Sequence, residues 1–211
     1  MVMRVFSFLI AALMALNLFA QNKTYSVTMY PQNKTAMVTL NDGRTVKAAN
    51  SNIFMKNAAL IYLQGTEIKE ARMDIIAKVD FDDRKFVNIE NKLAYFVDSI
   101  GGNSLYCIEL IDMDAYKRNL QNNVNFTHID LSSERLESNV NNLNTEEDFQ
   151  LPIFKHFYFV LNGKVIQAHD RELYRALDKE KYRKLKTAII LPDFSWTDEA
   201  SLMKLLKMIS Q

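Results

Sequence analysis

The sequence has almost no cysteine, since Cys107 is the only one in 211 residues. A single cysteine cannot form a disulfide within one chain, so packing and hydrogen bonds must hold the fold together. The residues around it, Leu105–Leu110, are mostly apolar and typical of a strand. We therefore expect a buried thiol that acts as a small hydrophobic side chain. A reactive thiol is the alternative.

Glycine is also scarce, with five in the whole chain, and none lies in a glycine-rich loop suited to phosphate binding. Gly102–Tyr106 begins like the turn that carries a nucleophilic serine. It lacks the closing glycine, however, and it precedes a strand instead of following one. The three histidines, His128, His156 and His169, match no spacing typical of a metal site. The sequence thus predicts no metal, no cofactor and no identifiable catalytic residue.

Neither sign of charge dominates, because 26 lysines and arginines accompany 25 aspartates and glutamates, for a net charge of +1. This balance argues against nucleic acid as a partner. The charges are nevertheless unevenly distributed along the chain. Asp130–Asp148 holds six acidic residues and one basic residue, whereas Arg171–Lys186 holds seven basic and three acidic residues.

The basic stretch is the candidate binding surface that the sequence offers. One hypothesis is that it faces an anionic partner, with Tyr174 and Tyr182 interleaved among the basic residues. The favoured alternative is a solvated helix face on which ion pairs four residues apart neutralise much of the charge. The basic residues of this surface are Arg171, Arg175, Lys179, Lys181, Arg183, Lys184 and Lys186.

A long apolar run occurs only at the beginning of the chain. Met1–Arg4 carries one positive charge, and Val5–Ala20 is apolar apart from Ser7 and Asn17. This pattern is typical of a secretory signal peptide over residues 1–20. As a helix, the apolar run would span about 24 Å, less than the hydrocarbon core of roughly 30 Å. An uncleaved anchor and an ordinary buried helix are the alternatives. We predict a periplasmic or secreted protein with no transmembrane segment after signal removal.

Residues 21–116 are expected to form a β-rich unit, either barrel-like or sandwich-like. Short β-prone runs follow one another between turn signals such as Asn41–Gly43. Ile75–Phe81 alternates apolar and polar residues, as a half-buried strand does. Leu105–Ile111 is apolar on both faces, which favours a central strand. The first expected strands are Tyr25–Tyr30, Thr35–Leu40, Arg44–Ala49 and Asn52–Met55.

Residues 117–150 are predicted to be an acidic, asparagine-rich linker, because eight asparagines between Asn119 and Asn144 leave little to bury. Residues 151–211 then begin with a β-hairpin around the two-residue turn Asn162-Gly163. Aromatic residues lie on both faces of its first strand, Phe154–Leu161. We therefore expect this hairpin to be buried on at least part of both sides.

Two or three helices are expected after the hairpin. Asp170 and Asp178 are the predicted N-caps of the first two, and Thr197 with Asp198 is expected to begin the last. The predicted fold class is therefore α+β, and whether its two halves share one core stays open. The apolar stripe expected to bury the last helix is Leu202, Leu205, Leu206 and Ile209.

Several stretches of the chain resemble uncharacterised exported proteins of gut-type Gram-negative bacteria. Those proteins end in a hairpin, a basic helix and a tail in which acidic residues and leucine follow a similar F-S-W sequence. The resemblance implies a periplasmic or secreted location, and no functional residues are carried over from it. It rests on Phe81–Phe86 with Ile111–Tyr116, and on Phe157–Ala168 with Lys184–Lys186 and Asp193–Leu202.

The function predicted from the sequence is that of a non-enzymatic envelope module that binds a protein or a glycan. Its support is the uneven charge distribution and the lack of any motif for a reaction class. The alternative is an exported hydrolase that uses scattered carboxylates or His128 and His169. A third hypothesis is association with a membrane surface through the basic residues.

Overall fold

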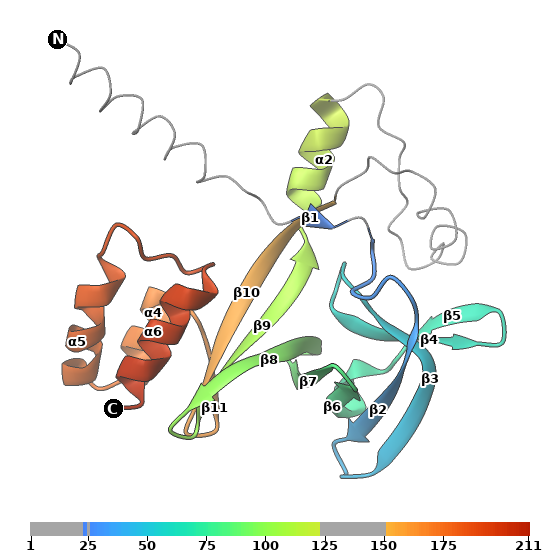
Figure 1. Ribbon diagram of the computed structural model, residues 1–211, viewed down its shortest axis with the longest axis horizontal. Coiled ribbons are helices and arrows are strands. Elements are labelled where there is room, and N and C mark those ends of the chain that lie inside the picture. Colours follow the sequence, from blue (N-terminus) through green and yellow to red (C-terminus); the bar gives the residue numbers. More distant parts are fainter. Residues whose placement is uncertain (1–22, 25, 123–150) are drawn as a thin grey trace.

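The computed structural model describes residues 23–24, 26–122 and 151–211 (Figure 1). These residues form a curled antiparallel sheet that resembles half of a barrel. Helices follow it in the C-terminal part of the chain. The protein is therefore α+β with a β-rich N-terminal part, which confirms the predicted fold class. The predicted signal peptide lies outside the described residues, as do residues 123–150 of the predicted linker.

None of the helices in these described ranges is long and apolar enough to cross a membrane.

The strands are β1 (Lys23–Thr24), β2 (Lys34–Leu40), β3 (Thr45–Phe54), β4 (Ala59–Gln64), β5 (Glu67–Glu70), β6 (Ile76–Phe81), β7 (Arg84–Ile89), β8 (Lys92–Ile100), β9 (Asn103–Ile111), β10 (Leu151–Leu161) and β11 (Lys164–Gln167). The helices are the 3₁₀ turn η1 (Met73–Ile75) and the α-helices α2 (Met113–Asn122), α4 (Asp170–Ala176), α5 (Lys179–Ile189) and α6 (Glu199–Ile209).

The sheet has the strand order β1-β10-β9-β8-β7-β6-β2-β3-β4-β5, and β11 pairs with β10 beside this path. Strands β2 to β5 follow one another as hairpins, and so do strands β6 to β9. The chain joins the two series by returning from β5 to pair β6 with β2. This return connection brings the two meanders into one curled sheet.

Strand β10 joins the C-terminal part of the chain to that sheet. It pairs with β9 over eight residue pairs, from Ile153 opposite Ile111 to Val160 opposite Ser104. Strand β9 therefore lies between β8 and β10, as its apolar sequence predicted. The two halves of the chain share one sheet in consequence.

The halves also share one hydrophobic core. Leu105 and Cys107 of β9 pack in the same cluster as Phe157 and Phe159 of β10. Helix α6 covers this face, where the whole predicted stripe is buried. The opposite face of β10 buries Tyr158 in a separate cluster, so the hairpin is buried on part of both sides, as expected.

The predicted turns are found where the strands reverse. Asn162 and Gly163 both have positive φ, at 51° and 79°, as a type I′ turn requires. Asn41–Gly43 connects β2 to β3, and Gly101 with Gly102 connects β8 to β9. The sequence that resembled a nucleophile-bearing turn is thus an ordinary hairpin.

Three predicted strands in the N-terminal part differ from the structure. Within Tyr25–Tyr30, the described residues form only an isolated bridge between Thr28 and Phe54. The predicted strands Arg44–Ala49 and Asn52–Met55 are one continuous strand, β3. Asn50 has a φ of 51°, and the register against β2 shifts in this region. Asparagine tolerates this conformation, so the strand bends without ending.

The helix caps agree with the sequence at one of three positions. Asp178 caps α5 as predicted, accepting a hydrogen bond of 2.8 Å from the Lys181 backbone N–H. Helix α4 is capped by His169, because Asp170 is already its first residue and binds the Tyr182 hydroxyl at 2.7 Å. Helix α6 is capped by Asp198, which was expected inside the helix, in place of Thr197.

We expect the Leu205→Ala substitution to lower the free energy of unfolding by about 2–5 kcal/mol, because it leaves a cavity under α6. Leu205 is fully buried against the sheet. The matched control is Leu191→Ala, at a leucine that is 52% exposed, where a change below about 0.5 kcal/mol is expected. Denaturant unfolding of both variants measures the difference. Equal losses would show that α6 does not cover the core.

Candidate binding surface

The seven predicted basic residues all lie on two consecutive helices and are all exposed. Arg171 and Arg175 are on α4, and the other five are on α5. Asp170 links the two helices, since its carboxylate binds both Tyr182 and Lys186 of α5. The seven residues therefore lie on two adjacent helices, but their side chains do not converge on one point.

Three of the seven residues have carboxylate partners. Arg175 pairs with Glu172 at 2.9 Å, and Lys184 pairs with Glu180 at 3.1 Å. Lys186 pairs with Asp170 at 3.1 Å and lowers the pKa of that carboxyl, after the larger effect of the Tyr182 hydroxyl. For these residues, the alternative of a self-neutralised solvated face is the better description.

The other four residues form no ion pair within the described ranges. Lys181 donates a hydrogen bond of 3.4 Å to the carbonyl oxygen of Ile209, at the end of α6. Arg171, Lys179 and Arg183 remain as exposed cations. These three, with Lys181, are the part of the predicted surface that is available to an anionic partner.

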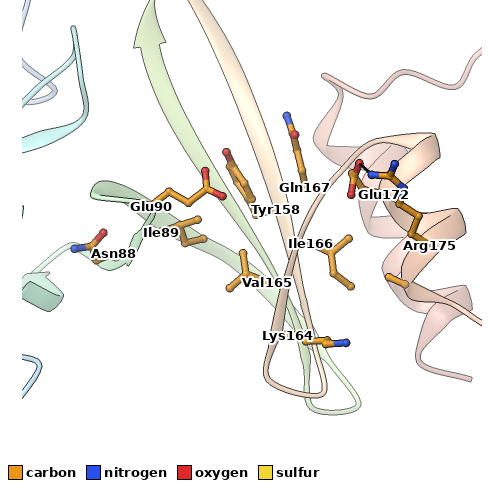
Figure 2. Close-up of a pocket in the computed structure, with 11 residues that line it drawn as sticks. Asn88, Ile89, Glu90, Tyr158, Lys164, Val165, Ile166, Gln167, Glu172 and Arg175 are labelled. Atoms are coloured by element: carbon orange, nitrogen blue, oxygen red, sulfur yellow. Dashed lines mark hydrogen bonds and ion pairs between the residues drawn. The ribbon is translucent and has the colours of Figure 1, made fainter. Parts of the chain in front are cut away.

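An open depression adjoins α4 on its sheet side, with a volume of about 530 Å³ (Figure 2). The β7–β8 turn, the β10–β11 hairpin and α4 form its walls. Its charged residues come from all three elements, and Arg175 connects it to the basic surface. The lining residues are Asn88, Ile89, Glu90, Tyr158, Lys164, Val165, Ile166, Gln167, Glu172, Arg175 and Ala176.

The depression combines both signs of charge with apolar side chains. Glu90 faces Tyr158, whose pKa rises because of burial and because of this neighbouring carboxylate. Val165 is 51% exposed and gives the depression an accessible apolar surface. Gln167 is an exposed amide, whereas the Asn88 amide is engaged by the carbonyl oxygen of Ile76 at 2.7 Å.

A second, more apolar depression of about 590 Å³ lies beside β3. Strand β4 pairs with β3 only over Ser51–Phe54, so the two strands separate beyond that point. Val46, which is 52% exposed, and Leu63 lie along the gap. Among the described residues that line it, only Lys47 and Arg72 are charged, so it offers fewer charged groups than the depression beside α4.

A charged cluster also interrupts the apolar face of the sheet. Lys155 of β10 pairs with Glu109 of β9 at 3.2 Å, and the Tyr95 hydroxyl donates to Glu109 at 3.1 Å. Cys107 lies next to this cluster with no exposed surface, and burial raises its pKa to about 12. The thiol is thus held protonated, which supports the expectation of a hydrophobic role over a reactive one.

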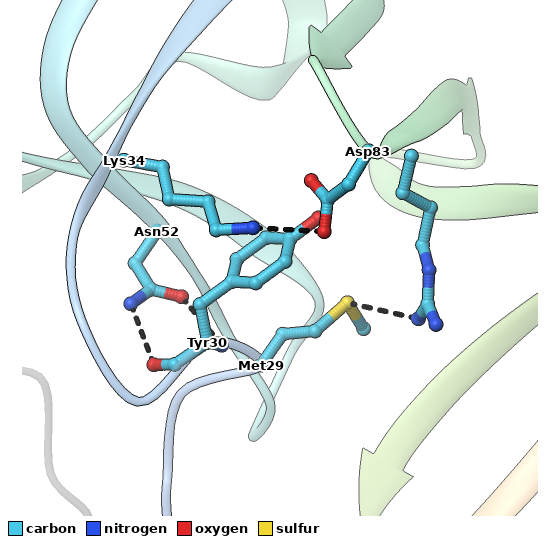
Figure 3. A network of polar contacts seen from close by, with 6 residues as sticks. Met29, Tyr30, Lys34, Asn52 and Asp83 are labelled. Atoms are coloured by element: carbon cyan, nitrogen blue, oxygen red, sulfur yellow. Dashed lines mark hydrogen bonds and ion pairs between the residues drawn. The ribbon is translucent and has the colours of Figure 1, made fainter.

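The network around Tyr30 fastens the segment before β2 to the sheet (Figure 3). Asn52 accepts from the Tyr30 backbone N–H at 3.0 Å and donates to its carbonyl oxygen at 2.9 Å. The Tyr30 ring packs on Phe81, and the Lys34 ammonium lies 4.1 Å above the ring centre while binding Asp83. Burial and the Asp83 charge raise the pKa of Tyr30 to about 12. These contacts are structural in kind.

The histidines do not form a site together. His169 caps α4 and stacks on Trp196, whereas His156 contacts the edge of Phe154 and has its pKa lowered by burial. His128 lies outside the described residues. Within the described ranges, no three His, Cys, Asp or Glu side chains are grouped so that they could hold a metal ion.

No known protein family, characterised protein or solved structure matches this chain. The candidate site is therefore argued from geometry and chemistry alone. Of its parts, the sequence indicated the basic residues, but it gave no signal for the depression beside α4. That depression joins residues 88–90 to residues 158–176, which only the sheet pairing brings together.

We expect Cys107 to react with a disulfide reagent only as fast as the protein unfolds. Its side chain is fully buried, and a thiol with a raised pKa carries little thiolate near neutral pH. Following the colour released by the reagent tests this, with the denaturant-unfolded chain as the control that gives one thiol. Complete reaction of the native protein within seconds would instead support the reactive-thiol alternative.

Proposed function

We propose that this protein is an exported, non-enzymatic envelope module that binds a glycan or a protein segment in the depression beside α4. The observation that carries the proposal is the mixed lining of that depression: Glu90 lies on one side, Glu172 and Arg175 lie on the other, and Lys164 is at the hairpin end next to exposed Val165. Sugar rings and peptide segments present hydroxyl or amide groups beside apolar surface, and this lining suits both.

The acids whose pKa values are displaced lie outside both depressions. A hydrolytic general acid needs a raised pKa so that it carries a proton at neutral pH. Every carboxyl whose pKa is displaced in the described residues is displaced downward, by hydrogen bonds or cations. These carboxyls belong to Asp42, Asp74, Asp83, Asp170 and Asp198.

Export is part of the proposal through the N-terminal apolar run over residues 1–20 and the resemblance to exported proteins. Both are properties of the sequence. An envelope location would place the depression among glycans and protein segments of the kind that its lining suits. Cleavage after Ala20 is the expected processing, and the mass of the protein recovered after export measures it.

The test of binding is capture by the exported protein of native envelope proteins and of immobilised envelope glycans. We expect Val165→Trp to weaken capture at least about tenfold, since the larger ring fills the depression. Gln167→Ala, which removes the side-chain amide, should weaken it severalfold. Equilibrium binding to the captured component then gives the affinity of each variant.

The matched control is Val46→Trp, which places the same ring at a valine of equal exposure in the other depression. It should leave capture unchanged. Loss of capture with Val46→Trp and not with Val165→Trp would overturn the assignment to the α4 depression. Shortened glycan or protein products after incubation would favour the exported hydrolase.

A further inference from the structure

One face of α5 carries a stripe of cations that ends in an exposed aliphatic residue. Lys179, Arg183, Lys186 and Ile190 are spaced by four, three and four residues, which places them on one side of the helix. The buried residue of the helix, Leu185, is not on this side. The stripe is therefore exposed, and at Lys186 it reaches Asp170 of α4.

The aliphatic end of the stripe is unusually exposed. Ile190 is 68% exposed, the highest value among the exposed large hydrophobic side chains of the described residues, and the adjacent Leu191 is 52% exposed. Both follow the last turn of α5, and Pro192 comes directly after them. The exposure of these two neighbouring aliphatic side chains to water is unfavourable. An apolar contact that buried them would lower the free energy.

The charge along the stripe is positive after its own ion pairs are counted. Lys186 is paired with Asp170, and Glu180 is occupied by Lys184. Lys179 and Arg183 form no ion pair within the described part of the chain. The net charge of the whole protein is only +1, so this local positive face is not a reflection of overall charge.

We propose that the stripe docks α5 on the anionic headgroups of a phospholipid membrane, with Ile190 and Leu191 inserted at the boundary with the acyl chains. Charge complementarity favours this occupant, because anionic headgroups attract each nearby lysine or arginine. The convex helix with an aliphatic tip suits a soft, planar surface. The stripe lies on α5, whereas the depression beside α4 contains no α5 residue, so either proposal can fail alone.

The experiment is co-sedimentation of the exported protein with vesicles of phosphatidylcholine alone or with about 30% phosphatidylglycerol. Binding should require the anionic lipid and should fall when salt rises from about 0.1 M to about 0.5 M. Lys179→Glu with Arg183→Glu should weaken binding at least about tenfold. This pair breaks no ion pair of the described structure, so the fold should be retained.

The charge-matched control is Lys78→Glu with Lys117→Glu, at exposed positions on β6 and α2. It changes the net charge equally and should leave vesicle binding unchanged. Ile190→Ser with Leu191→Ser should weaken binding severalfold while the salt dependence persists. Fluorescence of Trp196, the only tryptophan, checks the packing of the α5–α6 connection in every variant.

Three outcomes would overturn the proposal. The protein could fail to bind anionic vesicles at low salt, bind neutral vesicles equally well, or lose no affinity in the Lys179 and Arg183 variant. Binding of an acidic protein by the stripe with no vesicle binding would assign the surface to that other class of partner. Val165→Trp must leave vesicle binding intact, which separates this test from that of the depression.

Discussion

A single row of buried side chains crosses the sheet, and the arrangement of the other elements depends on it. The row runs from Phe157 of β10 through Cys107, Tyr95 and Phe86 to Val79 and then Val38 of β2, each residue directly opposite the next. All six are buried in one cluster. Because a shift of one residue would turn a strand's apolar side chains to the other face, this row fixes the register of six strands. Helix α6 then has one apolar surface to cover.

The sequence predicted those features that depend on neighbouring residues. Asn162-Gly163 determines its own turn, and Asp178 caps the helix that follows it. The pairing of β6 with β2 was not predictable, because it joins residues some forty positions apart and depends on the whole row. The cap of α4 was predicted one residue late, since a hydroxyl of the following helix binds the Asp170 carboxylate. Tertiary contacts decided both cases.

The candidate site likewise has features that the sequence indicated and features that it did not. Composition identified the basic surface, yet it could not tell that Arg175, Lys184 and Lys186 have carboxylate partners while Lys179 and Arg183 do not. Those pairs depend on side-chain positions that helix spacing allows but does not require. The depression was invisible in the sequence, because its walls meet only after β8, β9 and β10 have paired. Binding surfaces between elements distant in sequence are generally of this kind.

Strand β10 is synthesised later than its partner β9, and this delay affects how the chain folds during synthesis. Ribosomes produce the N-terminal part first, so β9 is complete while its neighbour, about 50 residues further on, is still absent. At ordinary rates of synthesis, this interval lasts roughly 3 to 10 seconds. During this interval, the edge of β9 is unpaired and its side chains are apolar on both faces. Such an edge can pair with a strand of another chain and so cause aggregation. A nascent chain of this protein therefore passes through a stage in which a holding chaperone would protect it most.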